Sequence, residues 1–123
     1  MKKLFASLAL VIVATLGLTA CSTPAAAPAA VSANTVVIDV RTPGEYSQGH
    51  LSGAVNIDVE SAGFDSLVKQ LPTDGSYVVY CHSGSRAAAA ASRMAAIGFS
   101  HVTNAGAMAD ASASTGLDIV TTP

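Results

Sequence analysis

Tryptophan is absent from the 123 residues, and charged residues make up only 11% of them. Beyond Lys2 and Lys3 no basic residues cluster, and the formal net charge is −2. Nucleic-acid binding needs a concentrated basic face, so the sequence gives no reason to expect a nucleic-acid partner. The length suits one compact domain, whose expected partners are small molecules or other proteins.

Cysteine is also scarce, since only Cys21 and Cys81 occur. Lys2 and Lys3 precede an apolar run, residues 4–16, that is too short to span a bilayer comfortably. The segment Leu18-Thr19-Ala20-Cys21 resembles a bacterial lipoprotein processing box. This resemblance implies cleavage before Cys21 and diacylglycerol on its sulfur, whereas an ordinary secretory signal cleaved near Ala20 is the alternative.

The signal has consequences for location and for the second cysteine. We expect a lipoprotein signal peptide over residues 1–20 and an extracytoplasmic protein, on the periplasmic or cell-surface side of a bacterial membrane. Lipidated Cys21 would anchor the chain to that membrane. Cys81 then has no intramolecular partner and is a free thiol in an oxidising compartment.

Composition changes sharply after the signal. Residues 21–34 contain small side chains and two prolines without apolar periodicity, so we predict an Ala/Pro/Ser-rich linker there. The folded domain is predicted over residues 35–123. Within it, the β-branched runs alternate with helical patterns, and this alternation is typical of an α/β fold with a mostly parallel central sheet flanked by helices.

The expected elements follow from local signals. Strands are predicted over 36–40, 54–57, 77–80 and 101–104. Thr42, Pro43 and Glu45 form a capping box that starts a short helix ending at Gly49. A second helix carries one apolar face, with the residues Phe64, Leu67, Val68 and Leu71. A third, alanine-rich helix ends at Gly98, and the chain from Gly106 onward gives weak signals, with at most a short helix.

The segment from Cys81 to Arg86 carries the chemistry. A parallel strand delivers Cys81 to the carboxyl edge of the sheet, where α/β proteins place their ligand sites. Gly84 allows the following loop to turn its backbone N–H groups inward, and the helix that begins next points its N-terminus to the same place. Such donors, with the Arg86 guanidinium, favour a thiolate over a thiol and equally favour a persulfide anion or a bound oxyanion. The competing interpretation is that Cys81 is a small buried apolar residue.

Three blocks of sequence resemble the single-domain rhodaneses. They are Asp39-Val40-Arg41-Thr42-Pro43-Gly44-Glu45-Tyr46, Gly49-His50-Leu51-Ser52-Gly53-Ala54-Val55-Asn56-Ile57 and Tyr80-Cys81-His82-Ser83-Gly84-Ser85-Arg86. The resemblance covers most of residues 36–106 and weakens after Asn104, where this chain has Ala105-Gly106-Ala107-Met108. It implies transfer of a sulfane sulfur from thiosulfate, or a similar donor, to cyanide or a thiol through a persulfide on Cys81. No cofactor or metal is expected.

The resemblance also implies roles for the neighbouring residues. The loop of His82, Ser83, Gly84 and Ser85 would hold the persulfide, and Arg86 would bind the anionic donor. Two roles remain open for His82, which either tunes specificity and proton traffic or points to solvent. We predict structural support from Asp39, Arg41, Glu45 and His50, with direct substrate contact as the alternative for the first three. His101 is predicted at the surface.

Two other functions compete with a small-molecule enzyme. One is a persulfide relay or docking module that serves a protein thiol. The other is a Cys-dependent phosphatase or arsenate reductase, which also binds tetrahedral oxyanions in a Cys-to-Arg loop. Those phosphatases resemble one another in having five residues between Cys and Arg, whereas four separate Cys81 from Arg86 here. The shorter loop should leave room for a sulfur atom and crowd a phosphate.

Overall fold

The computed structural model describes residues 31–121. The predicted signal peptide, Cys21 and most of the predicted linker therefore lie outside the described residues. At the start of the described part, the Thr35 amide donates to the Ser32 carbonyl, and Val31 packs against the core. No helix within residues 31–121 is both long enough and apolar enough to cross a bilayer.

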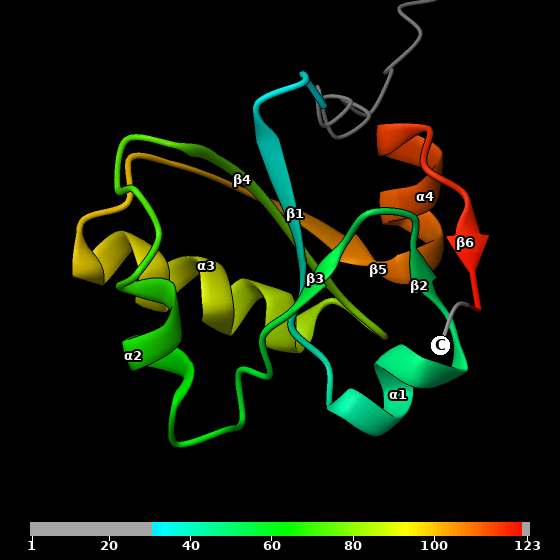
Figure 1. The fold of residues 1–123 in the computed structure, drawn as a ribbon, viewed down its shortest axis with the longest axis horizontal. Helices are drawn as coiled ribbons and strands as arrows, with labels where there is room; N and C mark the ends of the chain where they lie inside the picture. The colour runs from blue at the N-terminus through cyan, green and yellow to red at the C-terminus, as the bar shows by residue number, and fades with distance from the viewer. Residues whose placement is uncertain (1–30, 122–123) are drawn as a thin grey trace, which may run out of the picture.

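Four parallel strands form the central sheet in the order β3-β1-β4-β5 (Figure 1). Their bounds are Thr35–Asp39 for β1, Val55–Asn56 for β3, Ser76–Cys81 for β4 and His101–Ala107 for β5. Strand β4 lies between β1 and β5 and is buried from its second residue onward. The predicted α/β fold with a mostly parallel sheet is confirmed, and the last predicted strand is three residues longer than expected.

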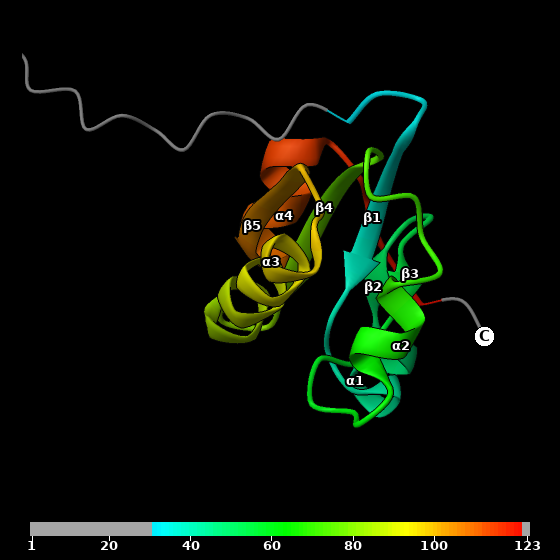
Figure 2. The same cartoon turned by 90° about the vertical axis from the view of Figure 1, so that its left-hand side faces the viewer.

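Helices cover both faces of this sheet (Figures 1 and 2). One face carries α2 (Phe64–Val68) and α3 (Ser85–Ile97). The other carries α4 (Met108–Thr115) and a small antiparallel sheet made of β2 (His50–Leu51) and β6 (Ile119–Val120). The short helix α1 (Pro43–Gln48) leads from β1 to β2.

Alternation along β4 divides the core into two layers. Tyr77, Val79 and Cys81 belong to the cluster packed with α2 and α3, whereas Val78 and Tyr80 belong to the cluster that contains Ala111 of α4. This is the period of two expected of a strand buried on both faces. The nucleophile candidate therefore faces the side of the sheet on which α3 begins.

The local helix signals were correct at α1 and α3 and partly wrong at α2. The capping box of Thr42 and Glu45 forms as predicted, and Gly98 ends α3 in the left-handed conformation with φ of 113°. Helix α2, however, ends at Val68, so Leu71 lies beyond it and Leu67 exposes 47% of its surface. Phe64, Val68 and Leu71 nevertheless pack against one core cluster, so the predicted apolar face is right at these three residues and wrong at Leu67.

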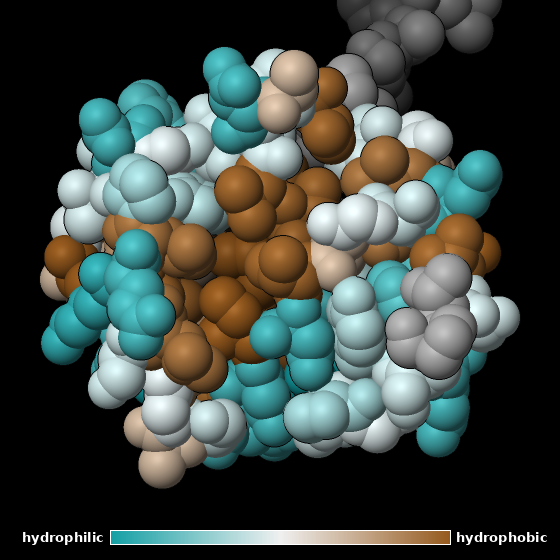
Figure 3. Space-filling model, viewed as in Figure 1, coloured by the Kyte–Doolittle hydropathy of each residue, from teal (hydrophilic) through white to brown (hydrophobic). Residues whose placement is uncertain are grey.

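Val55 of β3 and Leu67 of α2 are large apolar residues with exposed side chains. Figure 3 shows an apolar area in the middle of the face that Figure 1 presents, between β1 and α2. Only two residues of β3 pair with β1, so the first half of β1 has no neighbouring strand on that side.

Candidate active site

Cys81 is the last residue of β4, and its sulfur accepts a hydrogen bond from the Gly84 amide at 2.9 Å. The side chain exposes none of its surface and packs in the cluster that contains Val79 and Ala87. One amide faces inward as predicted, whereas the sulfur is not exposed to solvent.

Gly84 gives the loop its shape. Its φ of 102° lies in the left-handed region, which side chains with a Cβ adopt only with strain. A Cβ there would lie 3.6 Å from Gly106 Cα, so the loop also runs close to the end of β5. Because Gly84 turns the chain in this way, its amide points at Cys81 and α3 starts at the next residue.

The N-terminus of α3 adds further positive potential to the loop. No capping side chain accepts a hydrogen bond from the amides in the first turn of this helix. A helix of 13 residues carries a partial positive charge at this end. The strand end, the glycine turn and the helix start together form a setting that stabilises an anion on or beside the sulfur.

Arg86 lies at the end of this loop and is held by Glu45. Its two terminal nitrogens donate to the two carboxylate oxygens of Glu45, each at 2.7 Å. The hydrogen bonds from Arg86 lower the pKa of Glu45 well below the usual range of a carboxylate, and the same contact raises the pKa of Arg86. Glu45 also accepts from the amide and hydroxyl of Thr42, so the start of α1 is joined to the start of α3.

A second charge network lies beneath the site. The Arg41 guanidinium donates to both carboxylate oxygens of Asp39 and to the Gly49 carbonyl, with both side chains almost fully buried. The Tyr80 hydroxyl donates to Asp39 at 2.8 Å and accepts from the Leu51 amide at 2.9 Å. Burial raises the pKa of Tyr80. The network therefore fixes β1, β2 and the residue that precedes Cys81 in one position.

The three histidines have different surroundings. His50 is buried, its ring stacks on Tyr46 with centroids 3.8 Å apart, and its Nδ1–H donates to the Tyr46 carbonyl at 2.9 Å. This surrounding is that of a structural residue. His82 is exposed and lines a pocket beside the loop, and His101 is exposed as well.

The structure thus brings together Cys81, its loop, Arg86 and Glu45, while Arg41 lines a pocket with Glu45 and His82 and is paired with buried Asp39. Comparison with known proteins now gives these residues a context. A family model described as "Rhodanese-like domain" matches residues 23–107. The chain belongs to the rhodanese-like domain family.

Individual relatives agree with this membership. Thiosulfate sulfurtransferase PspE of Escherichia coli (strain K12) is 35% identical over 74 residues, which cover 59% of this chain and 70% of the relative. A solved structure, a rhodanese with anions from E. coli, superposes on this chain with a TM-score of 0.61 at 28% sequence identity. The superposition covers 72% of this chain and 99% of the rhodanese. The protein is a rhodanese-like enzyme.

A shorter similarity points toward phosphatases. Human M-phase inducer phosphatase 1 is 48% identical over 46 residues, which cover 36% of this rhodanese-like chain and 9% of the phosphatase. So small a share of the phosphatase gives no reason to assign its activity to this chain. The similarity does make phosphate hydrolysis a reaction worth testing.

Several residues around the site were not predicted from the sequence. Gln48, Met108 and Ile119 line the pocket beside His82, and Tyr80 completes the Asp39 network. Successive side chains of a strand point to opposite faces of the sheet, so the residue directly before Cys81 faces the side opposite to Cys81. The placement of Tyr80 could therefore have been predicted from the sequence. Met108 and Ile119 carried no such signal, because only the folded C-terminal segment brings them to the loop.

Proposed function

We propose that this protein is a thiosulfate sulfurtransferase that carries the transferred sulfur as a persulfide on Cys81. The observation that carries the proposal is the Gly84 amide, 2.9 Å from the Cys81 sulfur at the N-terminus of α3. The name of its E. coli relative, thiosulfate sulfurtransferase PspE, supports the choice of donor. A sulfur donor and an acceptor are then the two substrates.

The first step loads the enzyme. The Cys81 thiolate attacks the outer sulfur of thiosulfate, the sulfur–sulfur bond of thiosulfate breaks, and sulfite leaves with the electron pair. The Gly84 amide and the positive N-terminus of α3 stabilise the negative charge on the sulfur throughout this step. Because Cys81 exposes none of its surface, the loop must move outward to admit the donor.

The second step unloads the enzyme. Cyanide or a thiolate attacks the outer sulfur of the persulfide, and the electron pair of the broken sulfur–sulfur bond returns to Cys81. This two-step scheme predicts ping-pong kinetics. Initial rates of thiocyanate formation at several fixed cyanide concentrations should give parallel lines in double-reciprocal plots against thiosulfate. Lines that intersect would show that both substrates bind together and would contradict the covalent intermediate.

Arg86→Gln should lower kcat/KM for thiosulfate by about 100-fold, because it removes the cation placed to offset the charge of the donor. Glu45→Gln is the matched variant, because it breaks the same ion pair and leaves the Arg86 cation in place. We expect Glu45→Gln to keep or raise kcat/KM for thiosulfate. An equal loss in both variants would show that the ion pair only supports the loop, and would remove donor binding from the role of Arg86.

Phosphatase activity is the competing reaction in the same loop. Four residues between Cys81 and Arg86 form a smaller ring than phosphatases of this kind use. Hydrolysis of an aryl phosphate that is lost in Cys81→Ser would favour the phosphatase. The proposed function requires that the purified protein leave the aryl phosphate intact while it consumes thiosulfate.

We also propose that the enzyme works on the extracytoplasmic side of a bacterial membrane, anchored through Cys21. The support is the segment Leu18-Thr19-Ala20-Cys21 after a short apolar run. Fractionation of cells should place the parent with membranes and Cys21→Ala in the soluble extracytoplasmic fraction, because the lipid is lost. Equal distribution of the two proteins would contradict the anchor.

A further inference from the structure

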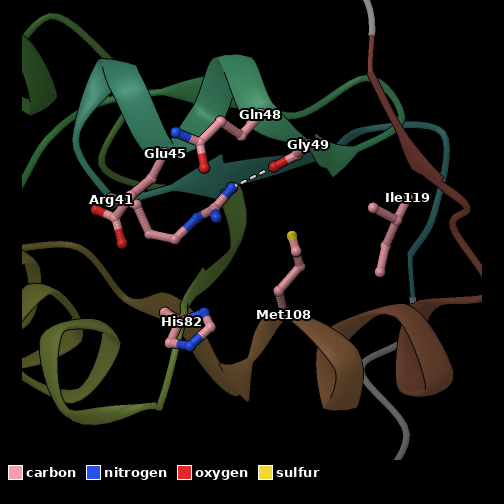
Figure 4. A pocket seen from close by; sticks show the side chains of 7 residues that line it. All are labelled: Arg41, Glu45, Gln48, Gly49, His82, Met108 and Ile119. Carbon is pink, nitrogen blue, oxygen red and sulfur yellow. Dashed lines mark hydrogen bonds between the residues drawn. The ribbon is translucent and has the colours of Figure 1, made fainter.

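A pocket of about 370 Å³ lies beside the Cys81 loop. Its walls come from the segment between β1 and α1, α1 itself, the residue after α1, the loop, the start of α4 and β6 (Figure 4). The lining residues are Arg41, Glu45, Gln48, Gly49, His82, Met108 and Ile119. Volumes of about 300–1,000 Å³ are typical of sites for organic ligands, so this one exceeds what a small inorganic anion needs.

Three connections relate this pocket to the Cys81 loop, although Cys81 itself does not line it. His82 follows Cys81 directly in the chain. Ala107 pairs with Cys81 across β4 and β5, and Met108 is the next residue. Glu45 holds Arg86 at the far end of the loop. A molecule in the pocket would therefore contact His82 at the start of the loop and Glu45, which holds Arg86 at the end of the loop.

The charges around the pocket are already balanced. The Arg41 guanidinium is occupied by Asp39 and the Gly49 carbonyl, and the Glu45 carboxylate is occupied by Arg86. Of the charged residues that line this space, Arg41 is already paired and Glu45 is an anion, so neither offers a dianionic donor an unpaired positive charge. Charge balance therefore argues against the donor as the occupant.

The uncharged walls favour an organic molecule. Figure 4 shows the Met108 side chain extending into the space from α4, with Ile119 at one side and Gln48 at the top. Ile119 exposes 48% of its surface although it is a large apolar residue. A thioether and a branched aliphatic side chain offer contact to an apolar body, and Gln48 offers one amide to a polar group.

We propose that this pocket is the acceptor site and that it takes an organic thiol with an uncharged, apolar body. The inference rests on the proposed function. The acceptor thiolate attacks the outer sulfur of the Cys81 persulfide and forms a new sulfur–sulfur bond. The bond from that outer sulfur to Cys81 breaks, and its electron pair returns to the Cys81 sulfur. One thiolate and one persulfide anion are consumed and one of each is formed, so no oxidant or reductant is needed.

The test separates loading from unloading. The protein is first loaded with thiosulfate, and sulfite release measures this step. The loaded protein is then mixed with phenylmethanethiol or with cyanide, and the loss of the extra sulfur is followed by intact mass. Ile119→Trp fills the pocket at an exposed position. Val55→Trp is the matched control, because Val55 exposes 43% of its surface and does not line the pocket.

We expect Ile119→Trp to slow unloading by phenylmethanethiol at least about tenfold, the scale of a lost apolar contact. Unloading by cyanide should change by less than about twofold, because so small an acceptor needs no apolar wall. Val55→Trp should leave both rates unchanged. If Ile119→Trp fails to fold, Ile119→Ser removes the same apolar wall. It should also slow unloading by phenylmethanethiol more than unloading by cyanide, with a smaller difference between the two rates.

Two results would overturn the inference by itself. In the first, Ile119→Trp loads normally but unloads more slowly by the same factor with phenylmethanethiol and with cyanide. In the second, Ile119→Trp loads normally and unloads to phenylmethanethiol as fast as the parent protein. Absence of sulfite release from the parent protein would instead overturn the proposed function, and with it this inference.

Discussion

Cys81→Ser should abolish thiosulfate:cyanide sulfurtransfer, with a loss of several orders of magnitude in kcat. A serine hydroxyl at the end of β4 can accept the Gly84 amide as the thiol does, so the loop keeps its partner. It is, however, a poor nucleophile toward sulfur, and it forms no persulfide. Thiocyanate formation by the purified variant is the measurement.

The variant must be shown to fold before its inactivity is interpreted. Cys81 is one residue of a large buried cluster, and serine is of similar volume, so we expect the urea midpoint to fall only modestly. A folded Cys81→Ser protein with parental turnover would show that another group carries the sulfur. Since Cys81 is the only free cysteine among residues 31–121, no second thiol of that part can replace it.

Asp39→Asn should lower the free energy of unfolding by about 3–5 kcal/mol, because it leaves the Arg41 charge buried without its partner. The Asp39 carboxylate exposes none of its surface and accepts from Arg41 and from the Tyr80 hydroxyl. A loss of this size is a large fraction of the about 5–15 kcal/mol that stabilises a typical domain. Urea denaturation of the parent and variant measures it.

Asp65→Asn makes the same chemical change in an exposed ion pair. Asp65 and Arg93 lie 2.8 Å apart, with 46% and 40% of their side chains exposed. Exposed pairs contribute about 0–1 kcal/mol, so this variant should lose little stability. Equal losses from Asp39→Asn and Asp65→Asn would contradict the view that burial of the Arg41 charge makes the first pair important.

The sequence was sufficient where a local pattern determines the structure. Strand β4 is a continuous apolar run, and the caps at Thr42 and Gly98 depend on residues that are close in the chain. The position of Cys81 at a strand end, before a glycine turn and a helix, followed from the same local signals. These features need no knowledge of distant contacts.

Distant contacts explain what the sequence did not predict. Glu45 and Arg86 are 41 residues apart, and nothing in the sequence pattern pairs them rather than Glu45 with Arg41. Helix α4 has a weak apolar pattern, and β6 is two residues long and exists because it pairs with β2. The close approach of Gly84 to Gly106 at the end of β5 is another contact between distant residues, and no local signal sets it.

Cys81 is proposed to carry sulfur beside the Gly84 amide at the N-terminus of α3. The most direct test is the intact mass of the protein after thiosulfate treatment and removal of excess donor, compared between the parent and Cys81→Ser. The account predicts one added sulfur atom on the parent, none on the variant, and return of the parent to its original mass after cyanide. An unchanged parent mass, or the same added sulfur on the variant, would contradict it.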